Sequence, residues 1–110
     1  MLYVSFWASW CAPCIQNFKK YAEIRTQLES EGVLLLNVSI DKNKEAWRSH
    51  LEKQPINGIH VLAAKEDLYP EYELSSIPLY EIINKSGQFV YLSDEPNRDI
   101  IAQFRAWLEE

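Results

Sequence analysis

The stretch Cys11-Ala12-Pro13-Cys14 decides the fold of this chain, and it holds the only two cysteines among the 110 residues. It follows the apolar run Leu2–Trp7, which we expect to form a central strand buried on both faces. A long helical pattern begins at Pro13, so the two thiols stand at the N-terminal end of a helix. There the free backbone N–H groups and the helix dipole favour a negative charge. We therefore expect Cys11, facing solvent, to ionise more readily than an ordinary thiol.

Two other uses of this cysteine pair fit the sequence less well. A structural zinc site needs four nitrogen or sulfur ligands, and the remaining candidates, His50 and His60, are not spaced as a ligand pair. A purely structural disulfide would close a very short loop, whereas stabilisation by chain entropy grows with loop length. Pro13 suits the first turn of a helix under any of these interpretations. The pattern favours a redox-active dithiol.

The segment Phe6–Cys14, FWASWCAPC, resembles the active-site signature of the thioredoxin superfamily. Ser76-Ile77-Pro78 resembles the second landmark of that family, a cis-proline loop that packs against the dithiol. The insertion between the second strand and the second helix, together with Tyr72, resembles the TlpA/ResA group of thiol-disulfide oxidoreductases. The resemblance implies an α/β thioredoxin fold, with a central mixed sheet of about four to five strands flanked by helices in the order βαβ(αβ)αββα.

Hydrophobic periodicity and turn residues predict the elements along the chain. The first helix runs from Pro13 to about Ser30, with an apolar stripe at Ile15, Phe18, Ala22 and Leu28, and Gly32 closes it. The remaining predicted elements are a strand over 33–40, a helix over 44–53 capped by Asp41 or Asn43, a short strand over 58–62, a brief helix over 66–72, a hairpin of strands 79–83 and 88–92, and a last helix from Pro96.

Length and composition favour one compact domain over residues 1–110, because a chain with 47% hydrophobic residues can bury a core without disulfide staples. The net charge of −5 and the lack of a basic cluster argue against nucleic acid as a partner. No apolar run has the length of a membrane span, and no signal segment precedes the first strand. Since the resembled group carries further segments before this strand, we expect a domain excised from a longer precursor. We expect it to be a monomer.

The family resemblance assigns roles to individual residues. Cys11 would attack a substrate disulfide as a thiolate, and Cys14 would resolve the mixed disulfide. Trp7, Trp47 and Trp107 are expected to pack in the core. We expect no metal and no cofactor other than the Cys11–Cys14 pair itself. The residues expected to contact substrate are Trp10, Ala12, Pro13, Ile77 and Pro78.

The chain departs from the family pattern at positions near the dithiol. Ser5 stands where thioredoxin has a buried aspartate, and Asn17 stands where the TlpA/ResA group often has a glutamate. Lys19 replaces a helix-kinking proline of that group, and Leu79 replaces the threonine common after the cis-proline. Without the two acids, deprotonation of Cys14 would depend on water, the backbone or another acid such as Glu81.

The function that these observations favour is thiol-disulfide exchange with protein substrates. The subgroup resemblance implies a reductase of the periplasm or cell envelope, supplied with electrons by a partner thiol-disulfide protein; a cytoplasmic location also fits the two cysteines. One alternative is a redox-inert or regulatory binding module that uses the groove at Ile77-Pro78. Another is binding of Cu(I) or Zn²⁺ by the dithiol with ligands from outside the chain. The sequence leaves the direction of electron flow and the substrate open.

Overall fold

The computed structural model describes residues 1–64, 77–93 and 106, and of residues 89–93 it describes the backbone alone. The predicted helix over 66–72 and the predicted last helix, with Trp107, lie outside these residues. The elements in chain order are β1 Leu2–Trp7, α1 Ala12–Lys20, α2 Ala22–Ser30, β2 Leu34–Ser39, α3 Lys44–Lys53, β3 Ile59–Leu62, β4 Leu79–Ile83 and β5 Phe89–Ser93. No helix in the described part of the chain is long and apolar enough to cross a membrane.

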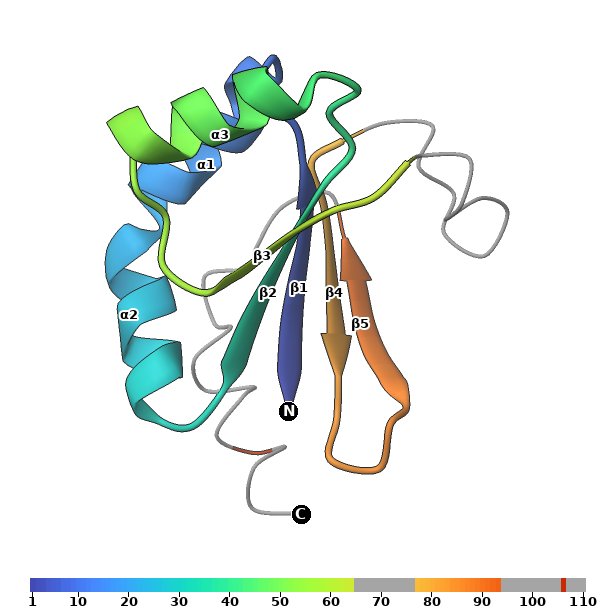
Figure 1. Ribbon diagram of the computed structural model, residues 1–110. Coiled ribbons are helices and arrows are strands. Elements are labelled where there is room, and N and C mark those ends of the chain that lie inside the picture. The colour runs from blue at the N-terminus through green and yellow to red at the C-terminus, as the bar shows by residue number, and fades with distance from the viewer. Residues whose placement is uncertain (65–76, 94–105, 107–110) are drawn as a thin grey trace.

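The strands form one mixed sheet in the order β3-β2-β1-β4-β5 (Figure 1). β1 pairs in parallel with β2, and β2 pairs in parallel with β3. β4 runs antiparallel to β1 and to β5, as the predicted hairpin requires. Every residue of β1 after Leu2 is buried, because this strand lies at the centre of the sheet. The α/β class and the mixed sheet agree with the prediction from the sequence.

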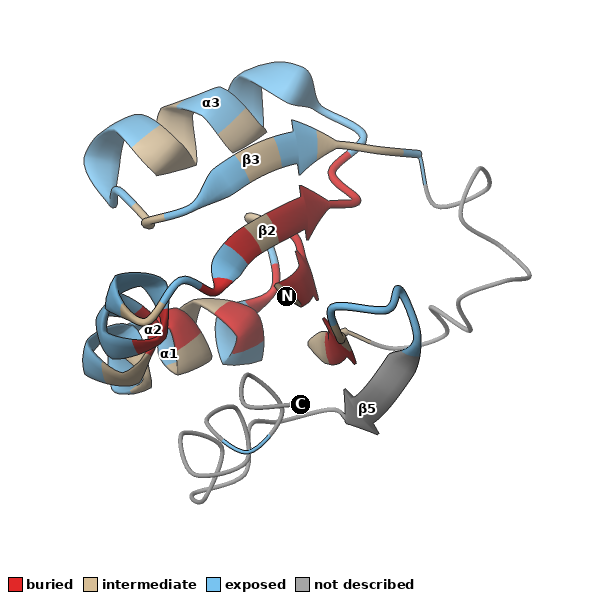
Figure 2. Ribbon diagram, turned by 90° about the horizontal axis from the view of Figure 1, so that it is seen from below, coloured by how far each residue is buried: buried red, intermediate tan, exposed pale blue. Residues whose placement is uncertain are grey.

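Helices α1 and α2 lie on one face of the sheet, and their buried residues are on the side toward the strands (Figure 2). Cys14 and Phe18 of α1 pack in a cluster with Trp7, whose ring meets that of Phe18 edge to face at 5.3 Å. Trp7 is completely buried in the core, and the partly buried Trp47 packs against the same cluster, so both have the packing role predicted for them. A second cluster joins Leu28 of α2 to residues of three strands and the segment before β2: Tyr3, Val33, Leu35, Tyr80 and Ile82.

The predicted single helix over 13–30 is divided at Tyr21, which corrects the expectation from the sequence. Tyr21 has φ −106° and ψ 16°, outside helical values, and it forms the end of α1 and the start of α2. Its N–H still donates to Asn17 O at 2.9 Å and its carbonyl accepts from Arg25 N at 2.9 Å. The change in direction therefore keeps the neighbouring helical hydrogen bonds, and it occurs without a proline or glycine.

Gly32 ends α2 as predicted. It has φ +94°, its N–H donates to Glu29 O, and Val33 N donates to Leu28 O, each at 3.1 Å. These two bonds form a Schellman motif, which satisfies carbonyl groups that the end of a helix leaves free. The helix over 44–53 also has its predicted bounds, since Asn43 Oδ1 accepts from Ala46 N and caps α3.

A buried cation that the sequence analysis did not predict lies between α2 and the sheet. Arg25 is 3% exposed. Its guanidinium donates to Ser5 Oγ of β1 at 3.2 Å, to Asn37 Oδ1 of β2 at 2.8 Å, and to Asn57 O at 3.1 Å. Burial lowers the pKa of Arg25, because a charged group loses hydration inside the protein. Arg25 joins α2 to two strands and to the segment that precedes β3.

Gly58 lies where that segment crosses β2 closely. It has φ +112°, and a Cβ atom there would stand 2.8 Å from Leu35 Cβ and 2.9 Å from Asn37 Nδ2. Gly87, in the turn between β4 and β5, also has a positive φ of +81°, but a Cβ there would meet nothing within 4 Å. Substitutions at these two glycines can therefore distinguish the cost of backbone strain from the cost of steric overlap.

We predict that Gly58→Ala lowers the free energy of unfolding by about 2 to 4 kcal/mol, the sum of a left-handed backbone penalty and overpacking. Gly87→Ala, the matched control, should cost only about 1 kcal/mol, since it carries the backbone term alone. Urea denaturation of both variants measures the difference. Equal losses would mean that the segment before β3 moves away from β2 without cost.

Candidate active site

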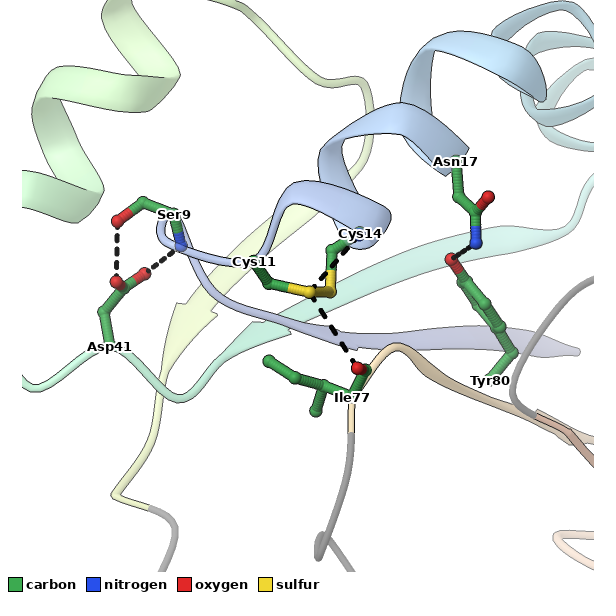
Figure 3. Close-up of a disulfide and its surroundings, with 7 residues drawn as sticks. All are labelled: Ser9, Cys11, Cys14, Asn17, Asp41, Ile77 and Tyr80. Atoms are coloured by element: carbon green, nitrogen blue, oxygen red, sulfur yellow. Dashed lines mark hydrogen bonds between the residues drawn. A yellow bond between two sulfur atoms is a disulfide. The ribbon is translucent and has the colours of Figure 1, made fainter.

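The two cysteines form a disulfide at the N-terminal end of α1 (Figure 3). Cys11 is the N-cap residue, with extended backbone torsions, and its Sγ accepts a hydrogen bond from Cys14 N at 3.3 Å. Pro13 occupies the first turn, where its missing N–H is not needed. No acidic residue lies in that turn. The backbone therefore presents donors and the positive end of the helix dipole to the sulfur of Cys11.

The disulfide is less open to solvent than the sequence predicted. Cys11 is 4% exposed and Cys14 is completely buried, so the expectation of a solvent-facing Cys11 is wrong for this oxidised form. Cys11 belongs to the core cluster around Trp7, and its Sγ lies 3.9 Å from Ile77 O (Figure 3). The chain before Pro78 covers the sulfur. Cys11 is nevertheless the more accessible member of the pair.

The residues expected to contact substrate lie around the disulfide. Trp10, which directly precedes Cys11, is 68% exposed, while Ile77 and Pro78 are half-buried. The Ile77–Pro78 peptide bond is cis, as the family resemblance implies. A tryptophan that serves only to stabilise the fold normally buries most of its side chain. The exposed indole of Trp10 beside the disulfide instead fits a role in surface contacts. A hollow of about 550 Å³ lies beside Trp10, and its other lining residues are Ser9, Ile40, Asp41, Lys42, Asn43 and Ala46.

Asp41 fixes the loop that leads into the disulfide, a role that the sequence analysis missed. Its Oδ2 accepts from Ser9 N at 2.9 Å, and its Oδ1 accepts from Ser9 Oγ at 2.7 Å. Ser39 Oγ donates to the same carboxylate at 2.6 Å. Asp41 is 5% exposed, so these bonds compensate for the lost hydration of its charge. The sequence does contain one indication of this role. Asp41 follows a buried strand, and it lies at the same edge of the sheet from which the cysteine loop emerges.

Neutral, hydrogen-bonded side chains occupy the two positions where the family resemblance places an acid. Ser5 is completely buried, and its hydroxyl accepts from Arg25 Nη1. Asn17 Nδ2 donates to Tyr80 Oη at 3.1 Å (Figure 3). In the described part of the chain, no three His, Cys, Asp or Glu side chains are grouped so that they could hold a metal ion.

Glu81 lies on the other face of the sheet from α1. Side chains alternate along a strand, and its neighbour Tyr80 reaches Asn17 of α1. Glu81 is 3% exposed, and burial raises the pKa of its carboxyl from an ordinary value near 4.5 to about 7. Because the Glu81 side chain points away from α1, Glu81 is poorly placed to act as the base for Cys14 that the sequence analysis considered.

The central mixed sheet, the disulfide at the start of α1 and the neighbouring cis-proline together define a protein with a thioredoxin fold. A family model described as thioredoxin-like matches residues 1–89. The chain belongs to the thioredoxin-like family.

Two curated relatives are thiol-disulfide oxidoreductases of Bacillus subtilis (strain 168). ResA is 27% identical over 89 residues, which cover 81% of this chain and 50% of that protein. Sporulation thiol-disulfide oxidoreductase A is 25% identical over 108 residues, which cover 96% of this chain and 64% of that protein. The chain thus spans between half and two thirds of the length of these relatives.

Solved structures confirm the fold. StoA from Bacillus subtilis has a TM-score of 0.75 at 23% identity, covering 97% of this chain and 81% of that one. The thioredoxin domain of a thiol-disulfide oxidoreductase from Bacteroides vulgatus has a TM-score of 0.82 at 19% identity, covering 94% and 77%.

We predict that Glu81→Gln changes how stability depends on pH. A carboxyl whose pKa is raised on folding keeps its proton longer in the folded than in the unfolded state. The wild type should therefore lose stability, relative to the variant, between pH 4.5 and 7. Above pH 7 the variant should be more stable by about 1 to 3 kcal/mol, and below pH 4.5 the difference should vanish.

Urea denaturation at several pH values measures this effect, with the exposed Glu52→Gln as control. Parallel pH profiles for all three proteins would show that Glu81 ionises as freely in the folded state as in the unfolded chain.

Proposed function

We propose that this domain is a thiol-disulfide oxidoreductase that exchanges the Cys11–Cys14 disulfide with cysteine pairs of protein substrates. The observation that carries the proposal is the N-cap geometry, in which Cys14 N donates to Cys11 Sγ. In the reduced protein the same N–H group and the helix dipole would stabilise a thiolate on Cys11, which is the reactive form of a thiol. The names of the two curated relatives support the same activity.

Reduction of a substrate would proceed in two displacement steps. The Cys11 thiolate attacks one sulfur of the substrate disulfide, forms a mixed disulfide and releases the other substrate sulfur as a thiolate. Cys14 then loses its proton and attacks Cys11 Sγ, which releases the second substrate thiolate and forms the Cys11–Cys14 disulfide. Two electrons pass from the domain to the substrate. A partner protein with a dithiol would restore the reduced form, and no cofactor beyond the cysteine pair is needed.

The surface around the disulfide suits an extended segment of substrate. The exposed indole of Trp10 and the hollow beside it offer apolar contact. The backbone at Ile77 and Pro78 lies next to Cys11, where it would pair with an extended strand that carries the substrate cysteine. Ala12 and Pro13, both exposed, complete this surface.

The proposal also covers the direction of electron flow and the cellular location of the domain. We infer a reductase that acts in the periplasm or cell envelope as a monomeric domain of a longer protein. The resemblance to the TlpA/ResA group supports the direction and the location, and the coverage of only part of each curated relative fits a domain of a longer protein.

Two cysteine variants test the proposal. We predict that the wild type reduces insulin in the presence of dithiothreitol, with or without a metal chelator. Cys14→Ser should accumulate mixed disulfides with substrate proteins, whereas Cys11→Ser should accumulate few, because the attacking sulfur is missing. Limiting iodoacetamide should modify Cys11 of the reduced wild type well before Cys14, which is completely buried.

Mass spectrometry identifies the modified cysteine and the trapped partners. Loss of activity with the chelator would indicate a metal-binding dithiol. Equal labelling of both cysteines, or no insulin reduction, would contradict the assigned roles and favour a redox-inert binding module.

A second prediction concerns the base for Cys14. Asn17 lies three residues after Cys14, on the same side of α1, where a carboxylate would face the resolving thiol. We predict that Asn17→Glu speeds the resolving step by about 10- to 100-fold near neutral pH. It should leave the pKa of Cys11 within about one unit.

Stopped-flow tryptophan fluorescence between pH 6 and 9 follows this step. The matched control Asn17→Gln has the length of the Glu variant but keeps a neutral amide, so it should not accelerate the resolving step. An unchanged or slower step in Asn17→Glu would show that Cys14 already has a sufficient base.

A further inference from the structure

A cavity separate from the hollow beside Trp10 lies between α1, α2 and the segment that joins α3 to β3. Its volume is about 190 Å³. The apolar part of its wall comes from Ile15, Phe18, Ala22, Pro55 and Ile56. An apolar cavity of about 150 Å³ is large enough to hold benzene. The cavity therefore has room for one small molecule with a flat apolar body.

Arg25 gives this cavity a buried positive charge. The three atoms to which its guanidinium is bonded, in Ser5, Asn37 and Asn57, are neutral oxygens. Its Nε is buried without a hydrogen-bond partner, and its guanidinium carbon lies 5.0 Å from the centre of the Phe18 ring. Buried charges are normally paired, because the loss of hydration is costly. The hydrogen-bond acceptors around Arg25 are thus neutral oxygens and not a carboxylate. The carboxylate of Glu29 acts on Arg25 only through its charge, and Glu29 does not line the cavity.

The other polar groups of the cavity add donors. Lys19 brings a second positive charge to the wall. His50 Nε2 is buried without a partner, and it can donate in the tautomer that carries its proton there. Among the described residues that line the cavity, none is acidic. A cavity whose wall is partly apolar and carries positive charges would attract an anion more strongly than a neutral molecule of the same shape.

We propose that this cavity binds a small organic carboxylate with an apolar, planar body of about the size of benzoate. The carboxylate accepts a hydrogen bond from Arg25, whose Nε has no partner among the described residues, and the apolar body fills the space between Phe18, Ala22 and Ile56. The site is distinct from the disulfide, and the proposal stands whether or not the domain reduces proteins.

Benzoate and benzyl alcohol, which have similar shapes and differ in charge, are the probes for the full chain. We predict that benzoate binds with a Kd below about 1 mM. Benzyl alcohol should bind at least about tenfold more weakly, a difference of 1.4 kcal/mol. Titration followed by ¹H–¹⁵N NMR, with the Arg25 Nε–H and the backbone amides of Ile15 and Ala22 as reporters, measures both affinities and locates the ligand.

Two substitutions make the test specific. Asn37→Asp keeps the shape of the side chain and gives Arg25 an internal carboxylate, so benzoate affinity should fall at least about tenfold while benzyl alcohol binding is unchanged. If Asn37→Asp does not fold, Ser5→Asp places a carboxylate beside Arg25 from β1 and should lower benzoate affinity in the same way. Ala22→Leu narrows the cavity from its exposed side and should weaken both probes.

Three results would overturn the proposal. The first is a wild-type spectrum that benzoate does not perturb at these groups. The second is equal affinity for benzoate and benzyl alcohol. The third is benzoate binding that neither carboxylate variant reduces.

Discussion

The hydrogen bonds of the buried Arg25 guanidinium hold together the parts of this fold that are far apart in the sequence. Its three acceptors come from β1, β2 and the segment before β3. The same segment crosses β2 at Gly58, where there is no room for a side chain. The cation thus fixes α2 on the sheet, and α2 continues from the helix that begins at the disulfide.

Three separate segments meet at the disulfide, and each restricts it differently. The first turn of α1 supplies the donor from Cys14 N to Cys11 Sγ. Asp41, two residues after the end of β2, holds the loop before the disulfide through Ser9. The chain at Ile77 lies over the sulfur of Cys11 and limits access from the other side. Within the described part of the chain, these three segments hold the disulfide in place, and the exposed side chain of Trp10 borders it.

Local sequence signals predicted the elements, whereas the features that depend on tertiary packing were missed. β1 and α3 have their predicted bounds, because an uninterrupted apolar run and the Asn43 cap are short-range signals. The break at Tyr21 has no proline or glycine to announce it. A charged residue in an amphipathic helix is normally assigned to solvent, so the burial of Arg25 could be found only from the oxygens that surround it. The burial of Cys11 likewise depends on a loop that lies 66 residues away in the chain.

The division of the first helix at Tyr21 leaves the disulfide on a helix of nine residues, with Cys14 and Phe18 as its two buried side chains. An isolated helix of that length is marginal in water, so α1 owes its order to docking on the sheet. Undocking of Phe18 and solvent access to Cys14 are then one cooperative event. How often the buried sulfur meets solvent is set by the free energy of this local unfolding, and amide hydrogen exchange within α1 reads it directly.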